Sequence, residues 1–240
     1  MSKKSNNMKT IICELQKGTE KSKDRWIGTK TGWKFYVHDE EKENLISKIM
    51  ILVEVHPTRQ KNGLSGFKLN IGISDDRKKA IETGRYENDE VGTERKITEI
   101  NKDIEMYNQL CVGRGNTEAI DLYISKDKNN VDTIIELKTN KDNTPLYAFV
   151  ETIKNYCLLK KINENQNPKE LILLAPKDYY KEYAKHENSI REFYRTIEKF
   201  NTENKNTTKF FVYALETIDD ETNLKRDNWK RLFVDDWLRL

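Results

Sequence analysis

Two apolar segments of strand length lie in the middle of the chain. Residues 118–125 and 132–139 are rich in isoleucine and leucine, and the polar loop 126–131 joins them. Short apolar runs bounded by polar turns are typical of β-strands, so we expect a hairpin here. The residues before this hairpin have helical spacing instead. They predict a helix that Thr93 caps and that continues through Ile97, Ile100, Ile104, Tyr107 and Cys111.

A second helix is expected after the hairpin. Thr144 is a natural cap and Pro145 a natural first helical residue, because proline has the helical φ angle and the first helical amide needs no partner. The apolar face of this helix would consist of Leu146, Phe149, Val150, Ile153 and Cys157. A buried strand over 171–175, which ends at Pro176, is expected to follow.

The C-terminal part predicts a helix, a strand and another helix. Ser189 and Glu192 have the spacing of a capping box and predict the start of the first helix. Residues 209–215 predict the strand. The last helix would be amphipathic, and we interpret it as a lid over the core. The alternative is that it forms the interface of a homodimer. Its apolar side would consist of Trp229, Leu232, Phe233 and Trp237.

The first third of the chain has a β-rich pattern. Apolar and other side chains alternate over 49–56 and 67–74, and an aromatic segment, 33–37, predicts a further strand. The strongly charged stretch 75–92 then loses this alternation and predicts a short helix and a connector between two parts of the chain. We therefore expect a β-rich N-terminal module over 1–92, which binds DNA or another subunit, and a second domain over 93–240.

Composition narrows the class of protein. The 240 residues are 35% charged and 36% hydrophobic, which is too apolar for a disordered chain and predicts a soluble globular protein. The net charge is only +3, so an anionic partner must be met by a local basic patch, and histone-like binding is excluded. The chain has no long apolar run and a polar N-terminus, so we expect a cytoplasmic protein without a membrane partner.

Cysteine usage agrees with a reducing compartment. The three cysteines are far apart and form no CxxC motif, which excludes a zinc ribbon and predicts reduced thiols that act as small buried apolar residues. They are Cys13, Cys111 and Cys157.

The predicted hairpin brings together side chains that can carry chemistry. If its turn is centred between Lys128 and Asn129, paired residues have numbers that sum to 257, and Asp121 lies opposite Glu136. Two opposed carboxylates among apolar neighbours need a compensating cation. Lys138 projects from the same face as Glu136. Two acidic oxygen donors and an ammonium suit a magnesium ion and a phosphate, with the ammonium orienting or deprotonating water or stabilising the phosphorane charge.

These residues resemble a known family. Asp121 followed on the next strand by Glu136-Leu137-Lys138, between two helices, is similar to the PD-(D/E)XK nuclease superfamily, whose restriction endonuclease-like αβββαβ core would span about Thr93 to Pro176. The resemblance implies an α/β fold with a mixed central sheet and helices on both faces. It also implies that Asp121 and Glu136 bind magnesium or manganese and that Lys138 is the catalytic lysine.

Some positions depart from the family pattern. Ile120 replaces the family's proline, and Thr152 stands where many relatives have a glutamine four residues before Tyr156. The first core strand would be the short segment 109–113. Many relatives take an extra acidic metal ligand from the first helix, for which Glu94 and Glu99 are the candidates, and we prefer Glu94.

The expected activity is that of a metal-dependent endonuclease that hydrolyses phosphodiester bonds in DNA. Lysines and an arginine around the proposed site predict contacts with nucleic-acid phosphates, with an ordinary solvated surface as the alternative. The residues chosen for these contacts are Arg114, Lys126, Lys141 and Lys154. Two rival hypotheses remain: a catalytically inactive protein of the same fold that binds nucleic acid or a protein partner, and a structural protein whose charged hairpin is only solvated.

Overall fold

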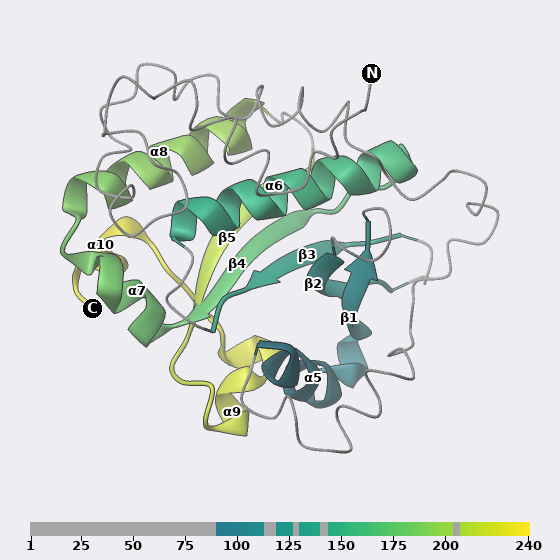
Figure 1. Cartoon of the computed structure of the whole chain (residues 1–240), viewed down its shortest axis with the longest axis horizontal. Helices are drawn as coiled ribbons and strands as arrows, with labels where there is room; N and C mark the ends of the chain where they lie inside the picture. The colour runs from purple at the N-terminus through teal and green to yellow at the C-terminus, as the bar shows by residue number, and fades with distance from the viewer. Residues whose placement is uncertain (1–89, 113–118, 127–129, 140–143, 204–206) are drawn as a thin grey trace, which may run out of the picture.

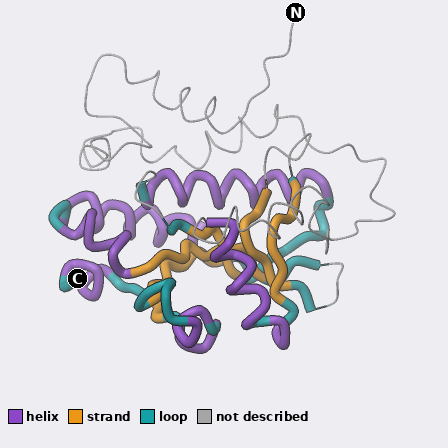
Figure 2. Tube along the Cα trace, turned by 60° about the horizontal axis from the view of Figure 1, so that its bottom comes forward, coloured by secondary structure: helices purple, strands orange, loops and turns teal. Residues whose placement is uncertain are grey.

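The described part of the chain forms a six-stranded sheet with helices on both faces (Figures 1 and 2). The computed structural model describes residues 90–240 except 113–118, 127–129, 140–143 and 204–206. The β-rich module predicted for 1–92 therefore lies almost wholly outside the described residues. The predicted α/β class with a mixed sheet flanked by helices is confirmed for the described part.

The first three strands are an antiparallel meander that follows one helix. Helix α5 (Glu90–Ile100) and the 3₁₀ turn η4 (Lys102–Ile104) precede β1 (Met106–Cys111), β2 (Ala119–Ile124) and β3 (Thr133–Leu137). Strand β1 pairs with β2, and β2 with β3, both in antiparallel register. The predicted hairpin is confirmed, with strand ends within two residues of the expected ones.

The next strands are parallel because helices connect them. Helix α6 (Pro145–Ile162) crosses from β3 to β4 (Glu170–Pro176), and α7 (Lys177–Ala184) and α8 (Glu187–Glu203) lead to β5 (Lys209–Leu215). The short elements α9 (Glu221–Leu224), η6 (Arg226–Asn228), β6 (Lys230–Arg231) and α10 (Val234–Leu238) end the chain, with β6 antiparallel to β5. As predicted, Thr144 caps α6 by accepting the amide of Tyr147 at 3.1 Å.

The apolar core has two layers, one on each face of the sheet. Helices α6 and α8 cover one face, and α5 and α9 lie on the other (Figure 1). Strands β3 and β4 are buried on both faces, as is typical of strands in a parallel sheet. None of the helices in residues 90–240, masked segments apart, is long and apolar enough to cross a membrane.

The first helix is shorter than its apolar spacing predicts. Helix α5 ends at Ile100, and Tyr107 and Cys111 belong to strand β1. The side-chain amide nitrogen of buried Asn101 donates to the carbonyls of Ile97 at 2.7 Å and Leu224 at 2.9 Å. Its side-chain oxygen accepts the backbone N–H of Arg226 at 2.7 Å. These contacts satisfy the helix end, so the chain can leave the helix there.

The start of α5 and two later helices also differ from the prediction. Helix α5 begins at Glu90, so Thr93 lies inside it and is buried, not a cap. Helix α8 begins at Glu187, which puts Ser189 inside the helix, and α7 was missed. The single C-terminal helix is wrong as well, because Trp229 lies between η6 and β6, Trp237 lies in α10, and the two rings pack into different core layers. Apolar residues that contact the core from separate elements can have the same spacing as one helical face, so local spacing alone does not separate the two cases.

Candidate active site

The β2–β3 pairing places two carboxyl side chains beside each other. Leu122 pairs with Ile135, Tyr123 with Ile134 and Ile124 with Thr133, so the paired numbers sum to 257, as predicted. The regular ladder stops before Asp121, and the amide of Leu137 instead donates to Asp121 Oδ2 at 2.9 Å. The side chain of Asp121 is thus fixed to β3 next to Glu136.

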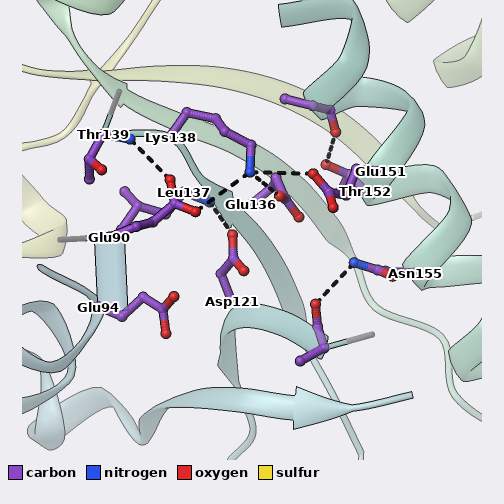
Figure 3. Close-up of polar contacts among 12 residues, drawn as sticks. Glu90, Glu94, Asp121, Glu136, Leu137, Lys138, Thr139, Glu151, Thr152 and Asn155 are labelled. Atoms are coloured by element: carbon purple, nitrogen blue, oxygen red, sulfur yellow. Dashed lines mark hydrogen bonds and ion pairs between the residues drawn. The ribbon is translucent and has the colours of Figure 1, made fainter. Parts of the chain in front are cut away.

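The ammonium of Lys138 is the centre of the cluster (Figure 3). It lies 2.5 Å from Glu136 Oε1, 3.3 Å from Glu151 Oε2 and 3.8 Å from Glu90 Oε1. Both Glu136 and Lys138 are buried, at 2% and 4% exposure. A strand-borne Glu-x-Lys on a solvated face would be exposed, so the burial argues against the solvated-hairpin hypothesis.

Two acidic members of this cluster were missed at the sequence level. Glu90 is the first residue of α5 and accepts the amide of Thr139 at 3.2 Å. Glu151 lies in the second turn of α6 and faces Lys138 (Figure 3). The available signals were weak: Glu90 lies one turn before Glu94, and Glu151 is the only acidic residue in α6.

The pKa of Asp121 is raised from 3.8 to about 7. Burial is the largest cause, and the carboxylates of Glu90 and Glu151 add to it, while Lys138 and the Leu137 amide oppose it. The cluster therefore carries more negative charge than Lys138 neutralises, and Asp121 changes its protonation near neutral pH.

Glu136 and Glu151 both contact the ammonium of Lys138, and each carboxyl group affects the pKa of the other. Burial, followed by the charges of Asp121 and Glu151, raises the pKa of Glu136 well above its usual value. Burial also acts to raise the pKa of Glu151, but Lys138 and the interaction with Glu136 outweigh it and lower that pKa. Burial opposes the charge of Lys138, yet the surrounding carboxylates raise its pKa. Lys138 thus stays protonated.

The chemistry of these side chains fits a hard divalent cation. Asp121 and Glu136 offer carboxylate oxygens, which magnesium prefers, and the excess negative charge around them would be relieved by a bound cation. Among the described residues, no three histidine, cysteine, aspartate or glutamate side chains are arranged to hold a metal ion. The ammonium of Lys138 contacts Glu136, Glu151 and Glu90 in this arrangement.

Glu94, the preferred extra ligand, is directed to strand β1. It is buried, and its Oε2 accepts from the amides of Gln109 at 2.7 Å and Asn108 at 3.5 Å. Gln109 has a φ of 59°, and the β1–β2 ladder is interrupted at this residue. A left-handed backbone at a non-glycine residue costs about 1–3 kcal/mol, so the contact with Glu94 helps to hold a strained position. The alternative ligand, Glu99, is exposed.

The expected glutamine position does not contact the cluster. Thr152 donates to the carbonyl of Ala148 in its own helix at 2.7 Å, and Tyr156 is buried. One turn beyond Glu151, Asn155 donates to the carbonyl of Ala119 at 3.2 Å (Figure 3), and its buried Oδ1 has no hydrogen-bond partner among the described residues. Asn155 thereby joins α6 to the start of β2.

The residues predicted to contact nucleic acid are not brought together. Arg114 and Lys141 lie outside the described residues. Lys126 is exposed at the turn end of the hairpin, five residues from Asp121 along the chain, or about 16 Å for an extended strand. Lys154 is buried at 1% exposure near Glu151, so the expectation of a surface position is wrong for it. Both described cysteines, Cys111 and Cys157, are only partly buried.

Comparison with known proteins adds no relative to these observations. No family model, curated protein or solved structure was found that matches the chain. The function is therefore argued from the site itself.

Proposed function

We propose that the protein is a metal-dependent endonuclease that hydrolyses phosphodiester bonds in DNA, with a restriction endonuclease-like fold. The observation that carries the proposal is the group of half-buried Asp121 with buried Glu136 and Lys138, which two adjacent strands bring together in the predicted register. The resemblance to the PD-(D/E)XK superfamily gives these three residues their roles. The order of one helix, three antiparallel strands, a crossover helix and a parallel strand supports it.

Each member of the cluster has a proposed task. Asp121 and Glu136 would hold the metal ion, which when bound polarises the phosphate and lowers the pKa of water. Lys138 stays protonated, so it serves as a hydrogen-bond donor and positive charge toward the phosphate oxygens, not as a base. Glu90 and Glu151 would hold the ammonium in place through their ion pairs.

The proposed reaction requires the site to stabilise negative charge in the transition state. A water oxygen attacks phosphorus while the bond to the leaving oxygen breaks, and negative charge accumulates on the phosphate oxygens in the transition state. A fixed ammonium stabilises that charge without a reorganisation cost. The three carboxylates that contact Lys138 limit its rotamers, which gives the required fixed position.

An inactive protein with the same fold is the second candidate. In that case the cluster would be a structural ion network, and nucleic acid or a protein partner would bind elsewhere. A buried network of this kind also perturbs pKa values, so titration alone does not separate the two functions.

Divalent metal is expected to separate them. Magnesium or manganese should raise the melting temperature of the protein and activate cleavage of plasmid DNA, because a bound cation relieves the repulsion among the carboxylates. Calcium should raise the melting temperature without supporting cleavage, since it accepts looser geometry and activates water poorly. Melts and plasmid incubations with each ion measure this; equal cleavage in EDTA would contradict the metal-nuclease proposal.

The two acidic residues of α5 should differ in their effects. Glu90 contacts Lys138, whereas Glu94 accepts from Gln109 and Asn108. We therefore expect Glu90→Gln to weaken magnesium binding, followed as the shift in melting temperature with metal, by about 10-fold. Glu94→Gln should mainly lower stability, by about 1–2 kcal/mol, because it disturbs a buried hydrogen bond to a charged group.

The exposed Glu99 on the same helix provides the control, since Glu99→Gln should change neither quantity measurably. If Glu94→Gln alone abolished metal binding, Glu94 would be a metal ligand, and its role at strand β1 would not be mainly structural.

A further inference from the structure

Arg231, on the edge strand β6, lies over two aromatic rings. Its Cζ atom is 4.2 Å from the ring centroid of Phe211 and 4.9 Å from that of Phe233. Such cation–π contacts restrict the guanidinium group at a surface where an arginine would otherwise be free to rotate. The side chain is therefore held in place before any ligand arrives.

A second arginine next to it has the same kind of surroundings. Arg226 lies over Tyr213 at 4.6 Å and over Trp229 at 4.9 Å. Tyr213 pairs with Arg231 in the β5–β6 ladder, so the two groups adjoin. Glu170 accepts from Arg226 at 3.5 Å. We call the resulting region the aromatic–arginine surface; it consists of Phe211, Tyr213, Arg226, Arg231 and Phe233.

Part of this surface is open to a ligand. Phe233 is 53% exposed and is the only large apolar side chain that is exposed in the described part of the chain. Arg231 is exposed as well, and the contacts described for its guanidinium group are those with the two aromatic rings. Neighbouring Lys230 is 70% exposed and only 3.8 Å from Glu216, a weak surface pair. The surface thus offers a ring face and guanidinium donors side by side.

We propose that the aromatic–arginine surface binds single-stranded nucleic acid. An unpaired base can stack on the exposed ring of Phe233, while the restrained guanidinium of Arg231 binds a backbone phosphate. A duplex keeps its bases stacked inside and cannot use the ring. An acidic peptide would satisfy the arginine but would leave the aromatic ring without a partner. The juxtaposition of both groups therefore favours single strands.

This surface is separate from the candidate active site. In the sheet order, β6 lies three strands from β3, or about 14 Å at the usual strand spacing. Tyr213 packs against the core layer on the α5 side, and the ion-pair partners of Lys138 are Glu90, Glu136 and Glu151, none of which belongs to the aromatic–arginine surface. The proposed binding goes beyond the endonuclease function and does not depend on it.

Binding of a fluorescent oligothymidine to the full chain in EDTA, followed by anisotropy, tests the proposal. Phe233→Ala, which leaves the charge unchanged, should weaken binding about 10-fold, the scale of one lost base stack. Arg231→Ala should weaken it similarly and lower the salt slope by about 0.7, as expected for one lost phosphate contact on a single strand. Arg195→Ala removes an equally exposed arginine that pairs within helix α8, and it should change the affinity less than twofold. Melting curves establish that each variant is folded.

Three outcomes would overturn the proposal: unchanged binding in Phe233→Ala, equal binding of a blunt duplex with the same sensitivity to that variant, or competition by polyglutamate as strong as that by unlabelled oligothymidine. EDTA prevents metal-dependent cleavage during the assay. A chain that binds oligothymidine through Phe233 and Arg231 but fails to cut DNA with magnesium would uphold this surface and refute the endonuclease proposal.

Discussion

Lys138→Ala is expected to reduce DNA cleavage by about 100-fold or more and to lower the free energy of unfolding by about 3 kcal/mol. The rate falls because the variant lacks the positive charge that the proposed mechanism places against the transition state. Stability falls because Glu136 and Glu151 are left without their buried cation. Affinity for DNA should change little. Single-turnover rates and denaturant unfolding measure the two effects.

Two further variants make this test specific. Lys138→Met retains more of the buried side-chain volume and should lose the same rate, which separates lost charge from a cavity. Lys126→Ala removes an exposed lysine at the turn end of the same hairpin and should leave rate and stability unchanged within about 0.5 kcal/mol. An intact rate in Lys138→Ala, with weaker and less salt-dependent DNA binding, would reassign Lys138 to a phosphate contact.

Asp121→Asn should abolish metal binding and cleavage while stabilising the metal-free protein at pH 8. The raised pKa of about 7 means that the folded chain keeps a proton on Asp121 that the unfolded chain releases near pH 4. Its contribution to stability is therefore complete below about pH 4 and is lost as the pH rises through 7. Asparagine loses no proton, so the variant should gain about 1 kcal/mol relative to the native chain at pH 8 and nothing at pH 4.

Unfolding curves at both pH values, with and without magnesium, measure this difference. Asp132→Asn, near the other end of the same hairpin, is the matched control and should keep the magnesium-induced stabilisation. A loss of several kcal/mol at both pH values would contradict the prediction. It would mean that the bond from the Leu137 amide to Asp121 is mainly structural.

The three central residues of the candidate site could be predicted because their arrangement depends on local geometry. A strand has a side-chain period of two, and the polar loop fixes the register of the hairpin, so Asp121, Glu136 and Lys138 followed from the sequence. Glu90 and Glu151 could not be predicted in this way. Their helices reach Lys138 only after packing on the sheet, and no local pattern specifies which turn of a helix faces a strand.

Helix ends were predicted well only where a local signal determines them. The Thr144–Pro145 pair marked the start of α6 because both residues act within one turn. The end of α5 depends on Asn101, whose partners include Leu224 and Arg226, more than 120 positions further along the chain. Apolar spacing continued past Ile100 and therefore predicted too long a helix. Contacts between residues so far apart in the sequence cannot be predicted from a local pattern.

The Asn101 contacts also affect the order of events on the ribosome. Strands β1, β2 and β3 pair with near neighbours in sequence and can form as soon as they emerge. Helix α5 carries Glu90. The side chain of Asn101, directly after this helix, forms its hydrogen bonds with Leu224 and Arg226 only after those residues have been synthesised. At 5–20 residues per second, about 6–25 s of translation separate the two. A nascent chain is therefore expected to remain without a complete cluster around Lys138, and so without the proposed nuclease activity, until its synthesis has passed Arg226.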